Sequence, residues 1–166
     1  IAACVCSGTP LSATPSASCS AAGDPHYRNF YSRKFDFYSR GLYEHASFTI
    51  EPCGCKVTIQ FLLALMTSGR NRANSIIVAA AVRVGLTTFT VTQGGLLSVY
   101  DLDGQLQAQL PPDEQASNNQ FGGVECVRER TGNHWGWRIV FPANAGSIRI
   151  RERAGDRLAP RVIGVP

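Results

Sequence analysis

The chain has few charged residues and no long hydrophobic run. Only 17% of its 166 residues are charged, it has one methionine, and its lysines are restricted to Lys34 and Lys56. The longest apolar runs, residues 61–66 and 76–82, are far shorter than the roughly 20 apolar residues that cross a bilayer as a helix. We therefore expect no membrane span in this chain.

Motifs of the common enzyme classes are also absent. The three histidines, His26, His45 and His134, have no sequence neighbours that form a recognisable catalytic triad or metal motif. Nucleophile elbows, zinc-protease motifs and phosphate-binding loops are missing, and the few carboxylates are scattered. We interpret His45 and the adjacent Glu44 as a surface pair. The sequence predicts a protein that is not an enzyme and that requires no metal or cofactor.

What the chain does contain is a series of short apolar runs separated by turn residues. The predicted strands are residues 43–50, 55–65, 75–84, 87–92, 96–102, 105–110, 120–127, 135–141 and 147–153. Asp103-Gly104 has the composition of a hairpin turn, because glycine tolerates positive φ. With 44% hydrophobic residues the chain can build a core. Regularly spaced short strands predict an all-β fold, an antiparallel sandwich of two sheets.

The positive charge comes almost entirely from arginine. The net charge is +4, and sixteen basic residues less two lysines leave fourteen arginines. Arginines alternate with isoleucines in residues 148–151 and occur again at Arg128 and Arg130. We interpret them as the solvated face of strands or, alternatively, as a docking face for acidic glycans or protein carboxylates. Nucleic acid is not an expected partner, because the charge is spread and no recognition motif is present.

Two tryptophans stand two residues apart in one predicted strand. Trp135 and Trp137 therefore share one face of the sheet. The sequence allows two interpretations, packing in the core or, together with Arg138, an aromatic platform for a glycan.

The cysteines predict disulfides and an extracellular location. The six residues are Cys4, Cys6, Cys19, Cys53, Cys55 and Cys126. An even number in a β-rich chain is typical of secreted proteins. Cys4 and Cys6 are too close in sequence to bridge each other comfortably, as are Cys53 and Cys55. We expect one of the first pair to bond to one of the second. A zinc site is the alternative, but it usually has wider cysteine spacing.

Composition divides the chain into three predicted parts. Residues 1–22 form a Ser/Thr/Pro-rich segment that the cysteines pin to the domain, and residues 23–153 form the β-domain. Residues 154–166 mix alanine, glycine, proline and arginine. We expect this last part to be an extended arm that reaches a neighbouring domain or subunit.

The most specific pattern lies in residues 19–43. Its members are Cys19, Gly23, Asp24, Pro25, His26, Tyr27, Phe30, Phe35, Phe37, Gly41 and Tyr43. Aromatic and charged residues alternate here with a period of two, which by itself predicts strands with one buried face. The stretch resembles the opening of a von Willebrand factor type D domain, an extracellular module of mucins and matrix proteins.

The resemblance implies a structural module of an extracellular matrix, appendage or mucus-like glycoprotein polymer. Such a module docks on other copies or other subunits, and a glycan- or ligand-binding sandwich is the alternative function. Leu42 stands where the family has a cysteine, and Tyr31 stands where it has a calcium-binding aspartate. The late cysteine-rich calcium loop is absent too, so we expect no family-type calcium site. Cys19 thereby loses its usual partner and is expected to bond to Cys126 or to a cysteine elsewhere.

The resemblance also raises the question of self-cleavage. In some mucins and related proteins the Gly-Asp-Pro-His sequence breaks between aspartate and proline. Here the Asp24 carboxyl would attack its own carbonyl, Pro25 would supply the leaving nitrogen, and His26 would assist proton transfer. A structural turn is the alternative interpretation.

Overall fold

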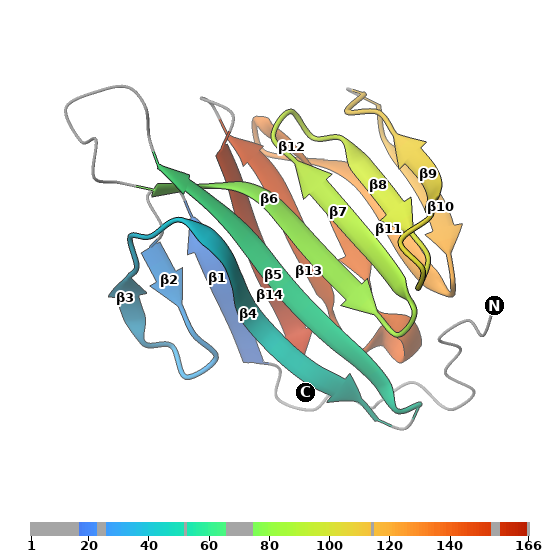
Figure 1. The fold of residues 1–166 in the computed structure, drawn as a ribbon, viewed down its shortest axis with the longest axis horizontal. Helices are drawn as coiled ribbons and strands as arrows, with labels where there is room; N and C mark the ends of the chain where they lie inside the picture. The colour runs from blue at the N-terminus through green and yellow to red at the C-terminus, as the bar shows by residue number, and fades with distance from the viewer. Residues whose placement is uncertain are drawn as a thin grey trace.

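The computed structural model describes residues 17–22, 26–51, 53–65, 75–113, 115–153 and 157–165. Two antiparallel sheets face each other and enclose the core (Figure 1). This arrangement confirms the predicted all-β sandwich. Within the described ranges there is no helix with the length and apolar character needed to cross a membrane.

The elements follow in chain order. They are β1 (Ala17–Ala22), β2 (His26–Arg28), β3 (Lys34–Asp36), β4 (Gly41–Ile50), β5 (Cys55–Leu65), β6 (Ser75–Val84), β7 (Thr87–Thr92), β8 (Leu97–Tyr100), β9 (Leu106–Leu110), β10 (Ser117–Phe121), β11 (Val124–Thr131), β12 (His134–Val140), the short 3-10 helix η1 (Pro142–Asn144), β13 (Ser147–Arg153) and β14 (Arg157–Val165). The smaller sheet is a simple meander, β4-β5-β6-β7-β8-β9. The larger sheet has the order β10-β11-β12-β13-β14-β1-β2-β3.

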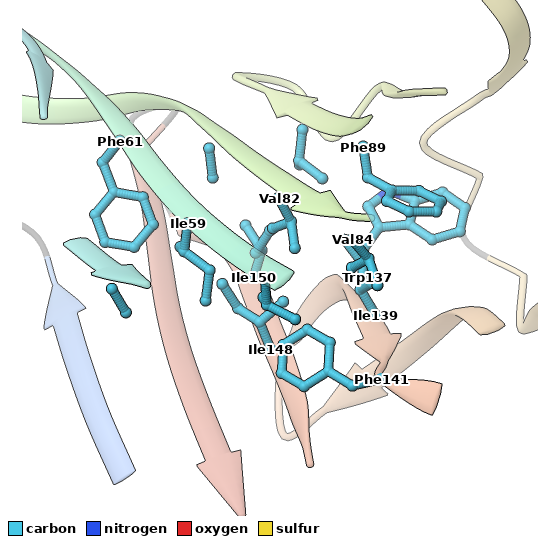
Figure 2. Packing of buried hydrophobic residues seen from close by; sticks show 14 of the residues in the cluster. Ile59, Phe61, Val82, Val84, Phe89, Trp137, Ile139, Phe141, Ile148 and Ile150 are labelled. Atoms are coloured by element: carbon cyan, nitrogen blue, oxygen red, sulfur yellow. The ribbon is translucent and has the colours of Figure 1, made fainter. Parts of the chain in front are cut away.

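The core lies between the two sheets. Figure 2 shows side chains from both, and the labelled ones are Ile59, Phe61, Val82, Val84, Phe89, Trp137, Ile139, Phe141, Ile148 and Ile150. Each of these ten is at most 1% exposed. Burying one such side chain contributes roughly 1.5–3 kcal/mol, so this interface is a principal source of stability.

The predicted strand 120–127 is wrong, because a hairpin turn divides it. Gly122 and Gly123 have φ values of +57° and +80° and connect β10 to β11. Two successive residues with positive φ match the twist of paired strands, and glycine adopts them without a steric penalty. The turn signal of this glycine pair outweighs the continuous β-like composition around it.

The predicted extended arm at residues 154–166 is also wrong. Strand β14 lies inside the larger sheet, where it pairs with β13 on one side and with β1 on the other. Pro160 has no N–H to donate and argues against a central strand. Pairing along both sides of β14 outweighs that single loss. Since β1 also belongs to the sheet, the predicted boundary at residue 22 does not separate it from the domain.

The predicted hairpin turn at Asp103-Gly104 is confirmed between β8 and β9. Gly104 has a φ of +76°. The Asp101 carboxylate oxygen Oδ1 accepts hydrogen bonds from the backbone N–H groups of Asp103 and Gln105 at 3.0 and 2.8 Å. The Asp101 side chain thus stabilises its own turn, as aspartate commonly does.

Replacing Gly136 by alanine is expected to lower the free energy of unfolding by about 2–3 kcal/mol. A Cβ atom at this position on β12 would lie 2.5 Å from the carbonyl oxygen of Ile150 and 2.9 Å from Cα of Arg151. Both atoms belong to the backbone of β13, so the two strands would have to separate. Urea denaturation measures the loss. Gly132→Ala is the control: a Cβ there meets open space, so only the backbone strain of a φ of +62° remains, about 1 kcal/mol. A loss at Gly136 no larger than the loss at Gly132 would contradict the argument.

Candidate functional site

The aromatic residues of the 19–43 stretch gather at one end of the sandwich, where β2, β3 and the start of β4 come together (Figure 1, left). They line a pocket of about 240 Å³. Its lining residues are Tyr27, Phe35, Phe37, Tyr43, Glu44, His45 and Phe61. The stretch that is most distinctive in the sequence therefore forms a cavity in the structure, which we call the aromatic pocket.

The rings of the aromatic pocket hold one another in defined orientations. Tyr27 stacks on Phe35, its cross-strand partner, with ring centroids 5.3 Å apart. Phe37 meets Tyr43 edge to face at 4.9 Å. Both distances lie in the favourable range of about 4.5–7 Å for aromatic pairs. Phe35 and Phe37 nevertheless remain 48% and 37% exposed, so the pocket is organised but open to solvent.

A network of hydrogen bonds fixes the chain between β3 and β4. The Tyr43 hydroxyl donates to the carbonyl oxygen of Arg40 at 2.9 Å and lies 2.7 Å from the Ser39 hydroxyl. Gly41 has a φ of +118°, which side chains rarely adopt. This glycine lets the chain turn back toward the Tyr43 ring. The segment that carries the exposed rings is thus held in place.

His45 does not form the predicted surface pair with Glu44, and a β-bulge is the reason. Glu44 pairs with Gln60 and Ala46 pairs with Ile59, so His45 is the extra residue between them. A bulge of this kind re-aims a side chain. The His45 ring points toward the space between the sheets, 4.5 Å from the ring centroid of Phe61. The strict alternation assumed from the sequence cannot reveal such an insertion.

The lining of the aromatic pocket is largely uncharged at neutral pH. Burial lowers the pKa of His45 to about 4, and its Nε2 lies 3.2 Å from the sulfur of Cys19. Burial, with a smaller contribution from Tyr43, raises the pKa of Tyr27 to about 12. A general acid or base works best with a pKa near the operating pH. The pocket is therefore suited to holding an apolar group rather than to proton transfer.

Further apolar residues are exposed around this end of the molecule. Leu42 on β4 and Leu62 on β5 are cross-strand partners, 59% and 41% exposed, on the outer face of the smaller sheet, opposite to the pocket-lining Tyr43 and Phe61. Tyr38 is 47% exposed and Tyr31 is 86% exposed. The neighbouring strands β3 and β4 are edge strands of the larger and the smaller sheet. Edge strands present backbone groups that can pair with another chain.

Of the predicted self-cleavage residues, only His26 lies within the described ranges. Its Nδ1 forms an exposed ion pair with Asp36 Oδ1 at 2.6 Å. Asp24 and Pro25 lie outside the described residues. Cleavage at Asp24–Pro25 stays a prediction.

The predicted glycan platform of Trp135, Trp137 and Arg138 is wrong. Trp137 is 1% exposed and donates its indole N–H to the carbonyl oxygen of Gly95 at 2.7 Å. Arg138 follows Trp137 directly, so alternation along the strand turns it to the opposite face. There it forms an ion pair with Glu129 at 3.0 Å. The three side chains cannot contact one ligand, and core packing is the role of Trp137.

The cysteines have different environments. Cys53 and Cys55 are disulfide-bonded, so they do not supply the thiolates that zinc would need. Cys4 and Cys6, their predicted partners, lie outside the described residues, so that pairing stays a prediction. No group of three or more possible metal ligands occurs in the part of the chain that the structure describes.

The predicted bond between Cys19 and Cys126 is wrong. Cys126 is a free, buried thiol, and burial raises its pKa to about 12. Cys19 is on β1 and Cys126 is on β11, four strands away in the same sheet. At about 4.8 Å per strand the two lie roughly 19 Å apart, far beyond the reach of a disulfide.

No protein-family model matches the sequence, and no curated protein does so with significance.

Proposed function

We propose that this chain is a secreted structural module that assembles by docking its aromatic pocket, with the exposed apolar residues around it, on the same region of a second copy. The observation that carries the proposal is the open aromatic pocket between two edge strands. Its partner surface is expected to be mainly apolar, because aromatic carbon dominates the lining, Tyr27 and His45 are neutral, and Glu44 is the acidic residue among the lining residues. An apolar surface is chemically complementary to itself, which favours a two-fold contact between copies.

The fixed orientation of the exposed aromatic rings supports docking. Phe35 and Phe37 are held by contacts with Tyr27 and Tyr43 and still face solvent. Rigid aromatic residues lose little conformational entropy on binding and are enriched at the centres of interfaces. A cluster of exposed apolar side chains on one end of a domain marks an interaction site more often than scattered ones do.

Two further observations are consistent with an extracellular assembly. Cys53 and Cys55 are disulfide-bonded, and disulfides persist in oxidising compartments. Four of the seven residues that line the aromatic pocket, Tyr27, Phe35, Phe37 and Tyr43, also carry the resemblance to the type D domain, an extracellular assembly module. A ligand-binding role for the pocket is the alternative, with a small apolar ligand in place of the second copy.

The double substitution Phe35→Ser/Phe37→Ser is expected to weaken self-association about tenfold or more, because it removes two side chains that line the aromatic pocket and are 48% and 37% exposed. Sedimentation velocity over a wide concentration range measures the association constant. The matched control is Leu102→Ser/Leu106→Ser, which removes two side chains that are 57% and 51% exposed in and after the β8–β9 turn. It should leave association unchanged.

Two results would overturn the proposed assembly. One is a wild-type protein that stays monomeric at the highest concentration reached. The other is an equal loss of association in both double variants, which would indicate non-specific apolar contact instead of a defined site.

A further inference from the structure

A line of basic residues crosses the outward face of the larger sheet. In order across six neighbouring strands its residues are Arg138 (β12), Arg149 (β13), Arg161 (β14), Ser20 (β1), Arg28 (β2) and Lys34 (β3). Each one stands opposite the next in the strand register, and five of the six are basic. Five intervals of about 4.8 Å give a line roughly 24 Å long. We call it the basic row.

The basic row faces away from the core. Arg149 lies between Ile148 and Ile150, which are both fully buried, so alternation turns it outward. Arg28 on β2 and Lys34 on β3 are exposed. Tyr27, the residue before Arg28 on β2, is 7% exposed and points to the inner face of the sheet. The described basic side chains of the row are therefore accessible from the side opposite to the hydrophobic core.

The acidic residues nearby do not neutralise the basic row. Glu129 accepts hydrogen bonds from Nε of Arg138 at 3.0 Å and from Nε of Arg149 at 2.6 Å. One carboxylate thus serves two guanidinium groups and leaves an excess positive charge. Arg138 and Arg149 keep about a third of their side-chain surface exposed, 32% and 31%. Asp36, beside Lys34, hydrogen-bonds to His26 at 2.6 Å and is the second carboxylate near the row. Five cations less two carboxylates, Glu129 and Asp36, still leave a net positive charge.

We propose that the basic row binds an acidic polysaccharide that carries carboxylate or sulfate ester groups along its length. A straight row of cations is complementary to a linear polyanion laid across the strands. Guanidinium groups present parallel N–H donors that match planar or tetrahedral oxyanions.

The chemistry of the face favours an acidic polysaccharide over nucleic acid. Single-stranded nucleic acid is held by aromatic side chains on which bases stack, and the basic row contains none. Trp137 lies on the opposite face of β12 in the core. Duplex DNA is read by elements that enter its grooves, whereas this surface is the face of a sheet. Disulfide-bonded Cys53 and Cys55 also indicate an oxidising compartment.

The test compares two double variants that remove the same charge from opposite faces of the sandwich. Arg28→Gln/Lys34→Gln alters the basic row, and Lys56→Gln/Arg83→Gln alters exposed residues on the smaller sheet. Each lowers the net charge from +4 to +2, since each removes two cations. The probe is a fluorescent heparin oligosaccharide long enough to span the row, titrated at several salt concentrations. The first variant should bind about tenfold more weakly and show a smaller salt dependence, and the second should bind as the wild type does.

A third variant gives a change in the opposite direction. Glu129→Gln removes the carboxylate that Arg138 and Arg149 share and is expected to tighten heparin binding severalfold. A circular dichroism spectrum equal to that of the wild type separates this gain from non-specific binding by an unfolded basic chain. Equal losses in the two double variants would overturn the proposed site in favour of a net-charge effect. Tighter binding of single-stranded DNA of equal charge, lost in the first variant alone, would reassign the basic row to nucleic acid.

Discussion

Replacing Arg128 by alanine is expected to lower the free energy of unfolding by about 3–5 kcal/mol, because it leaves a cavity where a large side chain was buried and also removes the partner of Glu152. Arg128 is 1% exposed although it is charged. Its Nη1 pairs with Glu152, and its Nε donates to the backbone carbonyl of Asp113 at 3.1 Å. The guanidinium carbon lies 5.2 Å from the ring centroid of Trp137, which adds a cation–π interaction. The Glu152 carboxylate and the Asp113 carbonyl oxygen both lose a hydrogen-bond donor when Arg128 is removed.

Urea denaturation of Arg128→Ala and Arg130→Ala provides the measurement and its control. Arg130 is exposed on the same strand, two residues away, and its loss should change the free energy of unfolding by no more than about 0.5 kcal/mol. Arg128→Met separates charge from packing. It retains most of the volume, and Glu152 is 25% exposed and can become hydrated. We therefore expect Met to restore part of the lost stability. An Arg128→Ala loss below about 1 kcal/mol would contradict the assigned role.

The protein is expected to lose about 2 kcal/mol of stability between pH 7 and pH 5 through His45 alone. The pKa of His45 is about 4 in the folded protein, and its ordinary value is 6.5. As the pH falls below 6.5, the unfolded chain binds a proton that the folded chain excludes. The folded state therefore loses stability progressively, and the loss levels off near pH 4, where the folded protein also becomes protonated.

His45→Phe isolates this effect from the titration of other groups. The new ring keeps the contact with Phe61 but cannot bind a proton. The difference in unfolding free energy between pH 7 and pH 5 should shrink by about 2 kcal/mol in this variant. His134→Gln on β12 is the control and should retain the wild-type dependence. If both variants behave as the wild type does, the ring of His45 is not excluded from protonation in the folded state.

The sequence was sufficient to predict the strands of the smaller sheet. For β5, β6 and β7 the predicted and observed bounds coincide, because apolar residues alternate on one face and turn residues mark both ends. The Asp103-Gly104 turn was predictable for the same local reason. Interactions between residues close in sequence determine both the strand bounds and this turn, so each can be predicted from its own segment alone.

Features that combine distant segments were not predictable. The bulge that turns His45 inward arises from the pairing of β4 with β5, and the alternation around it gives no sign of it. The charge of Arg128 indicated a solvated position, yet Glu152, 24 residues later, makes its burial tolerable. A local pattern cannot include a partner that only folding brings into contact.

By itself the sequence determined the class of the fold, the positions of most turns and the alternation that places the aromatic residues of the 19–43 stretch on one face of their strands. These depend on periodicity and turn chemistry, which act over a few residues. The tertiary structure alone decided the order of strands in the larger sheet, where β14 places the C-terminal part of the chain between β13 and β1. The basic row exists only through that order, since its residues come from both ends of the chain and become neighbours when long-range strand pairing sets the register.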